Sequence, residues 1–148
     1  MKHLSKFFKL DYQKKQLLIN TFIVLTLVRL GLWLLSFKTL HKLLLRLSNT
    51  KPKCQEKYHV SIDKIIWAVE VSSYYMPGGV KCLARALTCQ FFMSRHGYTS
   101  NLCIGVAKDI EGELKAHAWL ENQGQVVIGD VADLSHFSQL ASFTKEHL

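Results

Sequence analysis

A nearly uninterrupted apolar run over residues 17–37, LLINTFIVLTLVRLGLWLLSF, constrains the fold of this chain more than any other feature. As a helix, a run of this length is long enough to cross about 30 Å of hydrocarbon. Arg29 stands near its centre, however, and an arginine there costs roughly 2.5–3.5 kcal/mol on insertion scales. Three interpretations stay open: contact with or passage through a membrane, docking of a partner, or packing on the protein's own core.

The next segment and the charge distribution indicate a separate N-terminal part. Residues 38–47 place leucines at helical spacing, with Lys38, Lys42 and Arg46 on another face. Residues 1–60 carry 12 Lys and Arg against 2 Asp and Glu, whereas residues 61–148 carry 7 against 9. We therefore expect a basic, apolar helical extension over 1–47, a polar linker over 48–60, and a catalytic or binding domain over 61–148.

The rest of the chain passes from helical to strand patterns. A helix is expected from Ser61, its N-cap, to the turn at residues 76–79, and a second over 82–95. Residues 101–107, 114–121 and 125–130 have the character of strands, the last two joined around Gln123-Gly124. Residues 131–148 are weakly patterned and predict only a short helix or cover. This order favours an α+β fold with a small antiparallel sheet packed on a helix.

The cysteines and histidines do not form a metal-binding pattern. The four cysteines contain no CxxC pair, and no Cys/His spacing fits a structural zinc site. We expect no metal and no cofactor. No cleavable signal peptide is recognisable, so a cytoplasmic protein with free thiols is predicted, with or without membrane association through residues 17–47.

Cys82 is the candidate nucleophile. It opens a predicted helix just after Pro77-Gly78-Gly79, so its thiol would feel the positive end of the helix dipole, and the thiolate is the reactive form. Backbone N–H groups at a helix start are free to receive an oxyanion, and Gly79 lets a substrate backbone come close. Taken alone, a free cysteine is more often a small core residue, and this is the better interpretation for Cys89.

The predicted hairpin supplies a possible base and its orienting group. With a two-residue loop, Trp119 would face Ile128 and His117 would face Asp130, within reach of an imidazole–carboxylate hydrogen bond. Each residue alone has an ordinary explanation, as a surface histidine and a strand-ending aspartate. Their coincidence downstream of Cys82 favours a Cys-His-Asp triad, with Glu121 and Asp133 as substitute orienters.

Two further side chains are weaker candidates for substrate binding. Arg85 lies one turn after Cys82 and could bind carbonyls or a carboxylate, although a solvated arginine is equally compatible. Trp119 shares the strand face of His117, and packing is its simpler role.

Three motifs resemble one family. Residues 81–87 (KCLARAL) resemble its C-L-x-R-[SA]-L nucleophile motif, residues 116–121 (AHAWLE) its H-A-W-[VL]-E motif, and residues 127–130 (VIGD) its acidic third position. The family is the leader peptidases of lasso-peptide biosynthesis, a branch of the transglutaminase-like superfamily. The resemblance covers roughly residues 60–148.

The resemblance implies a transglutaminase-like, papain-like fold and a cysteine endopeptidase that cuts a precursor between leader and core. It also implies a separate leader-recognition-element protein and a macrolactam synthetase that closes the ring. Two other functions stay open: a non-catalytic, membrane-associated binding module, and acyl transfer to an amine by the same triad. Nucleic-acid binding is not expected, because the basic residues alternate with leucines rather than with a groove-reading or stacking motif.

Overall fold

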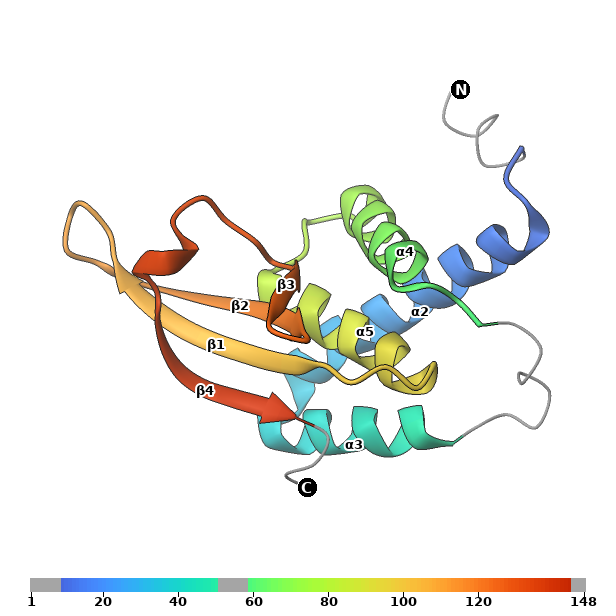
Figure 1. Ribbon diagram of the computed structural model, residues 1–148, viewed down its shortest axis with the longest axis horizontal. Coiled ribbons are helices and arrows are strands. Elements are labelled where there is room, and N and C mark those ends of the chain that lie inside the picture. Colours follow the sequence, from blue (N-terminus) through green and yellow to red (C-terminus); the bar gives the residue numbers. More distant parts are fainter. Residues whose placement is uncertain (1–8, 51–58, 145–148) are drawn as a thin grey trace.

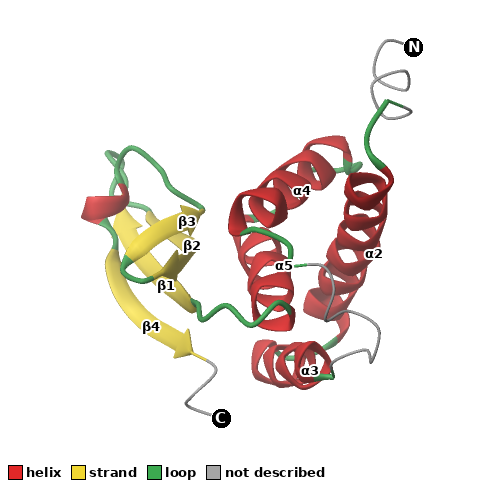
Figure 2. Ribbon diagram, turned by 45° about the vertical axis from the view of Figure 1, so that its right-hand side comes forward, coloured by secondary structure: helices red, strands yellow, loops and turns green. Residues whose placement is uncertain are grey.

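The helices and the strands form two layers. The computed structural model describes residues 9–50 and 59–144, and Figures 1 and 2 show the helices on one side and the sheet on the other. The helices are α2 (Tyr12–Leu34), α3 (Phe37–Asn49), α4 (Ile62–Tyr75) and α5 (Cys82–Arg95). The strands are β1 (Asn101–Lys108), β2 (Leu114–Asn122), β3 (Gln125–Ile128) and β4 (Ser138–Thr144), with a short 3-10 helix, η1 (Leu134–His136), before β4. This confirms the α+β class and the apolar N-terminal helix.

Helix α5 lies at the centre of the fold. Every residue from Ala86 to Ser94 is buried, so the helix is covered on all sides. Its neighbours are the three other described helices and strands β1, β2 and β3, of which β2 packs on it most closely. Leu87, Phe92 and Met93 supply much of its apolar surface, and its buried polar side chains, Thr88, Gln90 and Ser94, are hydrogen-bonded.

Helix α2 packs one face on the rest of the chain. Thr21, Leu25, Val28 and Gly31 are buried against the neighbouring helices. Gly31 lies so close to α3 that an added Cβ would be 2.6 Å from Leu40 Cδ1, so a larger residue would require the Leu40 side chain to move. Part of the apolar run therefore belongs to the protein's own core.

The N-terminal helices and the predicted linker overlap slightly. Helix α3 ends at Asn49, so it includes the first two residues of the linker predicted over 48–60. Residues 51–58 lie outside the described residues, and the division of the chain at this point stays a prediction.

Buried polar side chains join α3, α5 and β4. His41 Nε2 donates a hydrogen bond of 2.9 Å to Gln90 Oε1, because an amide oxygen can only accept. Gln90 in turn donates to the Phe143 carbonyl at 3.1 Å, and the Ser48 hydroxyl donates to that of Ser94. All four of these side chains are buried, so the network fixes how α3 sits on α5 and the sheet edge.

The sheet has the strand order β3-β2-β1-β4, and all neighbours are antiparallel. The predicted two-residue loop between β2 and β3 is present: Gln123 and Gly124 both have positive φ, 51° and 78°. Positive φ at both central positions is typical of the type I′ turn, which suits the twist of a hairpin.

The sequence pattern did not predict strand β4. Its segment was expected to form only a short helix or cover, but after η1 it pairs with β1 at the edge of the sheet. Most of its side chains are exposed or half-buried, so the strand lacks the clear alternation that marks a core strand.

Acid should weaken the fold through His41. Burial lowers the pKa of this histidine below its usual 6.5, and the Gln90 hydrogen bond only partly opposes the shift. The unfolded chain therefore binds the proton more tightly than the folded chain. The stability that neutral His41 contributes is complete above pH 6.5 and declines as pH falls toward the pKa of the folded state. We expect a lower melting temperature at about pH 5 than at about pH 7.5.

A histidine variant tests this assignment. In His41→Leu the difference in melting temperature between the two pH values should shrink, whereas His136→Gln, at an exposed position in η1, should keep it. His96, whose pKa burial and the Arg95 charge also lower, leaves a residual difference. An unchanged pH dependence in His41→Leu would contradict the role given to this buried histidine.

Candidate active site

Cys82 is the first residue of α5, as the sequence predicted. Lys81 is the N-cap, and in the described structure no side chain caps this helix end. The backbone N–H groups of the first turn have no intrahelical acceptor, so they are available to an incoming oxyanion. A carbonyl carbon attacked by the thiol would stand next to these donors.

Cys82 is also the most accessible of the described cysteines. It is partly exposed, whereas Cys89 and Cys103 are buried. Burial raises the pKa of Cys89 to about 12 and that of Cys103 to about 11, with the Glu70 and Glu121 carboxylates adding to the respective shifts. Cys89 is fully buried within the core cluster, which confirms core packing for this residue. Cys54 lies outside the described residues.

The loop before Cys82 depends on two glycines and on Arg29. Gly78 and Gly79 have φ values of 78° and 69°, which other residues rarely adopt. The Arg29 guanidinium reaches from α2 and donates a hydrogen bond of 2.9 Å to the Pro77 carbonyl. The Arg29 side chain, in the middle of the apolar run, thus points toward the protein and holds the loop that precedes α5.

Arg85 forms an ion pair with Glu70 of α4. Both side chains are partly exposed, and Arg85 Nε is a buried donor with no hydrogen-bond partner in the described structure. The pair links α4 to α5 one turn from Cys82. Binding of substrate by Arg85 stays a prediction, and it would have to use the donors that Glu70 leaves free.

His117 lies in a group of ring and backbone contacts on β2. Its ring stacks on Trp119 with centroids 6.3 Å apart and meets Phe137 at 5.5 Å. Its Nε2 is 2.6 Å from the Gly129 carbonyl oxygen. A carbonyl only accepts, so the proton is on Nε2 and the lone pair of the neutral ring is on Nδ1. The ring is therefore oriented as a base that can take a proton at Nδ1.

The register predicted for Asp130 is wrong. The first hairpin pairs, Asn122 with Gln125 and Glu121 with Val126, are those that a two-residue loop requires, but a bulge then shifts the pairing by one residue. Leu120, not Trp119, faces Ile128, and β3 ends there. Asp130 follows as an exposed residue, and the backbone carbonyl of Gly129 occupies the position expected for its carboxylate.

Gly129 and Phe137 are the site residues that the sequence reasoning missed. Gly129 has φ 86°, and an added Cβ would be 2.8 Å from the Ala118 carbonyl oxygen, so the close approach requires glycine. A glycine inside a predicted strand is a known sign of a bulge and could have revealed the shift. Phe137 reaches His117 from a segment with no clear pattern.

Trp119 supports His117 from the same face of β2. Only 5% of Trp119 is exposed, and its indole N–H donates to Glu121 Oε1 at 2.9 Å. Gly105 on β1 leaves the space that the ring fills, since an added Cβ there would be 2.9 Å from it. Glu121 is thus engaged by the tryptophan, while Asp133, the other substitute orienter, is exposed at the start of η1. Contact of Trp119 with substrate stays a prediction.

The structure does not join Cys82 to His117. Side chains alternate along β2, so His117 and Trp119 share one face and Leu120 points to the other. Leu120 packs in the core cluster with Leu87 of α5. In the described parts of the chain, no hydrogen bond connects Cys82 with His117 or His117 with Asp130, and all three assignments to a triad stay predictions.

Across residues 9–50 and 59–144, no group of three or more His, Cys, Asp and Glu side chains is placed to hold a metal ion. The chemistry available to the described site is that of a thiol, an imidazole and backbone donors.

Comparison with known proteins gives one match. A family model described as the transglutaminase-like superfamily covers residues 24–142, which begin within α2, include α5, β1, β2 and β3, and end within β4. No curated protein and no solved structure matched the chain.

Replacing Arg29 should loosen the loop before Cys82. Arg29→Leu removes the donor to Pro77, so we expect faster amide hydrogen exchange over residues 78–81 while amides in the middle of α5 stay protected. Thr26→Ala, on the exposed side of α2, is the matched control and should leave exchange in the loop unchanged. Equal exchange in the wild type and Arg29→Leu would show that the loop holds its shape without this bond.

Proposed function

Because the chain belongs to the transglutaminase-like superfamily, we propose that it is a cysteine peptidase with Cys82 as nucleophile, His117 as base and Asp130 as orienting residue. Membership suggests cysteine protease or acyltransferase chemistry. The observation that carries the proposal is the position of Cys82, a partly exposed thiol at a helix start that no side chain in the described structure caps.

The proposed reaction follows from these positions. The Cys82 thiolate attacks the carbonyl carbon of the scissile peptide bond, and the N-terminal backbone N–H groups of α5 stabilise the oxyanion. His117 takes the thiol proton at Nδ1 and passes it to the leaving amine. Water then attacks the thioester, gives a carboxylate product and restores the thiol.

An approach of His117 to Cys82 is part of the proposal. His117 lies on the face of β2 opposite to Leu120, which packs with α5, so the proposal requires β2 to rearrange against α5 and not only a hydrogen bond to shorten. We propose that the precursor and its recognition protein bring the two side chains together. The Gly129 carbonyl supports this role of His117 because it keeps the proton on Nε2 and leaves Nδ1 for the thiol.

The motifs around Cys82 and His117 support a narrower assignment. Through their resemblance to the lasso-peptide leader peptidases, we propose that the substrate is a ribosomally made precursor, cut between leader and core. The proposed partners are a separate leader-recognition-element protein, docked on the N-terminal helices, and a macrolactam synthetase that uses the released core. The proposed location is the cytoplasm.

One observation favours a second candidate, a binding module without activity. The missing hydrogen bond between Cys82 and His117 is what such a module would show. Acyl transfer to an amine is chemically equivalent up to the thioester, and product masses distinguish it from hydrolysis.

Peptide masses test the nucleophile. The purified chain is mixed with a lasso precursor and its recognition-element protein, and wild type is compared with Cys82→Ala. A leader fragment ending in a free carboxylate should form only with wild type, since the alanine variant has no nucleophile. A fragment joined to an added amine would instead indicate acyl transfer. Cleavage by Cys82→Ala equal to wild type would refute the mechanism, and cleavage by neither protein would favour the binding module.

A matched pair of aspartate variants tests the orienting group. Asp130→Asn should lower kcat by at least about tenfold if the carboxylate replaces the Gly129 carbonyl at Nε2 and stabilises the protonated imidazole, as charge-assisted hydrogen bonds are about twice as strong as neutral ones. Asp133→Asn, three residues further and equally exposed, should be near wild type. The reverse result would assign the role to Asp133, and full activity in both would leave the Gly129 carbonyl as the sole orienter of His117.

A further inference from the structure

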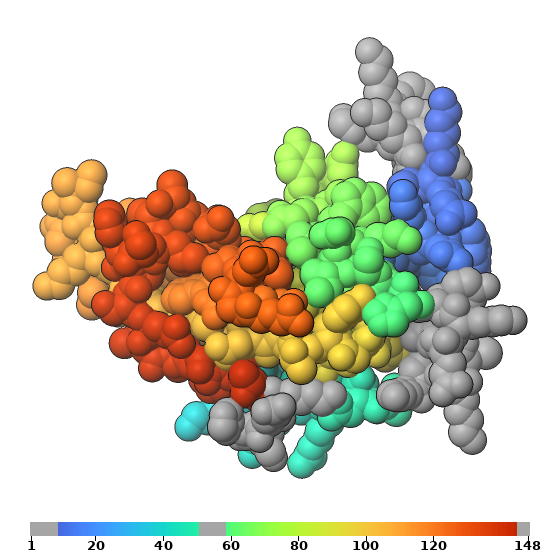
Figure 3. Space-filling view, in the orientation of Figure 1, coloured from blue at the N-terminus to red at the C-terminus, as the bar shows by residue number. Residues whose placement is uncertain are grey.

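The outward face of α2 is an apolar stripe without a partner in the described structure. Five residues recur at helical spacing along it and are between 49% and 68% exposed: Ile19, Ile23, Leu27, Leu30 and Leu34. The stripe runs about 22 Å along the helix at 1.5 Å per residue. In Figure 3 this helix, in blue, forms one edge of the molecule. An exposed apolar surface of this length on a chain marks an interaction site.

The packed inner face of α2 favours a helix that lies along a membrane surface over one that crosses the membrane. By length and composition α2 is the one helix among the described residues that could cross a membrane. Its inward face is packed, however, and Arg29 is bonded to Pro77. A helix that crossed a bilayer would leave these contacts, whereas a helix lying flat keeps them and presents only the stripe.

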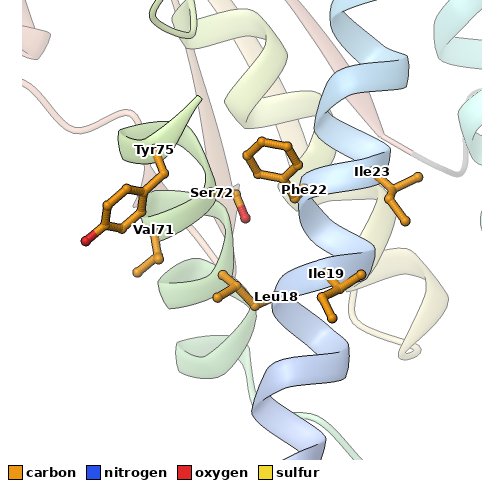
Figure 4. A pocket seen from close by; sticks show the side chains of 7 residues that line it. All are labelled: Leu18, Ile19, Phe22, Ile23, Val71, Ser72 and Tyr75. Carbon is orange, nitrogen blue, oxygen red and sulfur yellow. The ribbon is translucent and has the colours of Figure 1, made fainter. Parts of the chain in front are cut away.

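Aromatic side chains and a groove extend the apolar surface. Tyr12 and Trp33, near the two ends of α2, are 75% and 82% exposed. Tyrosine and tryptophan are enriched where a membrane meets water. Beside the stripe, a groove of about 290 Å³ opens between α2 and α4, with Phe22 and Tyr75 in its walls (Figure 4). Of the seven side chains that line the groove, only Ser72 and Tyr75 carry a polar group, a hydroxyl in each case, so the groove suits an apolar ligand.

The positive charge of residues 9–50 indicates which kind of apolar partner fits the stripe. Residues 9–50 contain seven Lys and Arg, and Asp11 is their only acidic residue. Lys38, Lys42 and Arg46 form an exposed row along α3, the helix that follows α2 directly. This excess of positive charge would repel a second copy of the chain, and it complements a surface that is both apolar and anionic.

We propose that the outward face of α2 rests in the plane of an anionic lipid bilayer. The stripe enters the boundary between headgroups and acyl chains, Tyr12 and Trp33 lie at headgroup level, and the basic side chains of the segment contact lipid phosphates. The catalytic side chains take no part in this contact. The proposal is therefore independent of the peptidase assignment.

Vesicle flotation with the full chain tests the proposal. Vesicles of phosphatidylcholine with about 30% phosphatidylglycerol should carry the protein, and pure phosphatidylcholine vesicles should carry much less, because the anionic surface attracts the basic segment. Salt at about 1 M should weaken the binding to the anionic vesicles without abolishing it, since the apolar contact is not screened.

Two double variants separate the stripe from general hydrophobicity. Leu27→Gln with Leu30→Gln should reduce the vesicle-bound fraction at least about tenfold, because two exposed leucines no longer enter the bilayer. Ile110→Gln with Leu114→Gln removes apolar side chains that are more exposed but lie in the β1–β2 hairpin, so binding should stay as in wild type. Circular dichroism and the melting temperature verify that both variants fold.

Three outcomes would overturn the proposal. They are the absence of binding to anionic vesicles, equal losses in the two double variants, and unchanged vesicle binding when the stripe is replaced. If the wild type is a dimer in solution and the stripe variant a monomer that still binds vesicles, the face joins two copies instead. If the stripe variant fails only to bind the recognition-element protein, the face is a protein interface.

Discussion

The burial of α5 on all sides is the constraint on which the other parts of the structure depend. Because residues 86–94 are enclosed, three helices and the sheet must be arranged around them, and the N-terminal helices are part of that enclosure. The His41–Gln90–Phe143 hydrogen bonds and the contact of Gly31 with Leu40 fix this arrangement at two points. The same arrangement leaves the start of the helix partly exposed, and Cys82 is its first residue.

The sequence was most informative where one physical signal dominated. The limits of α5 and the two-residue hairpin loop follow from apolar spacing and from Gln123-Gly124, and both are as predicted. Strand β4 could not be found because its side chains are mostly exposed and carry no alternation. The inward turn of Arg29 also escaped prediction, since its acceptor is a backbone carbonyl 48 residues away, and no sequence pattern encodes such a pair.

The residues of the candidate site also differ in how well the sequence predicted them. Cys82 at a helix start and His117 beside Trp119 could be read from the sequence because each depends on local geometry. The partner of His117 could not, because register in a hairpin changes completely with one extra residue. The bulge replaced an expected carboxylate with the Gly129 carbonyl, a neutral acceptor that fixes the tautomer but adds no charge to stabilise an imidazolium. The loop that Asp130 begins is the proposed source of a charged partner.

The hydrogen bond from Arg29 to Pro77 makes α2 mechanically continuous with the approach to Cys82. One face of this helix is exposed, and Arg29 on its other side holds the turn that positions Cys82. Thermodynamic reciprocity then applies: if occupation of the outer side shifts the position of Arg29, the state of the Cys82 loop shifts with it, and a peptide bound at the loop changes affinity at the outer side by the same factor. The Arg29 guanidinium is thus placed to couple contacts on the outer face of α2 to the conformation of the loop before Cys82.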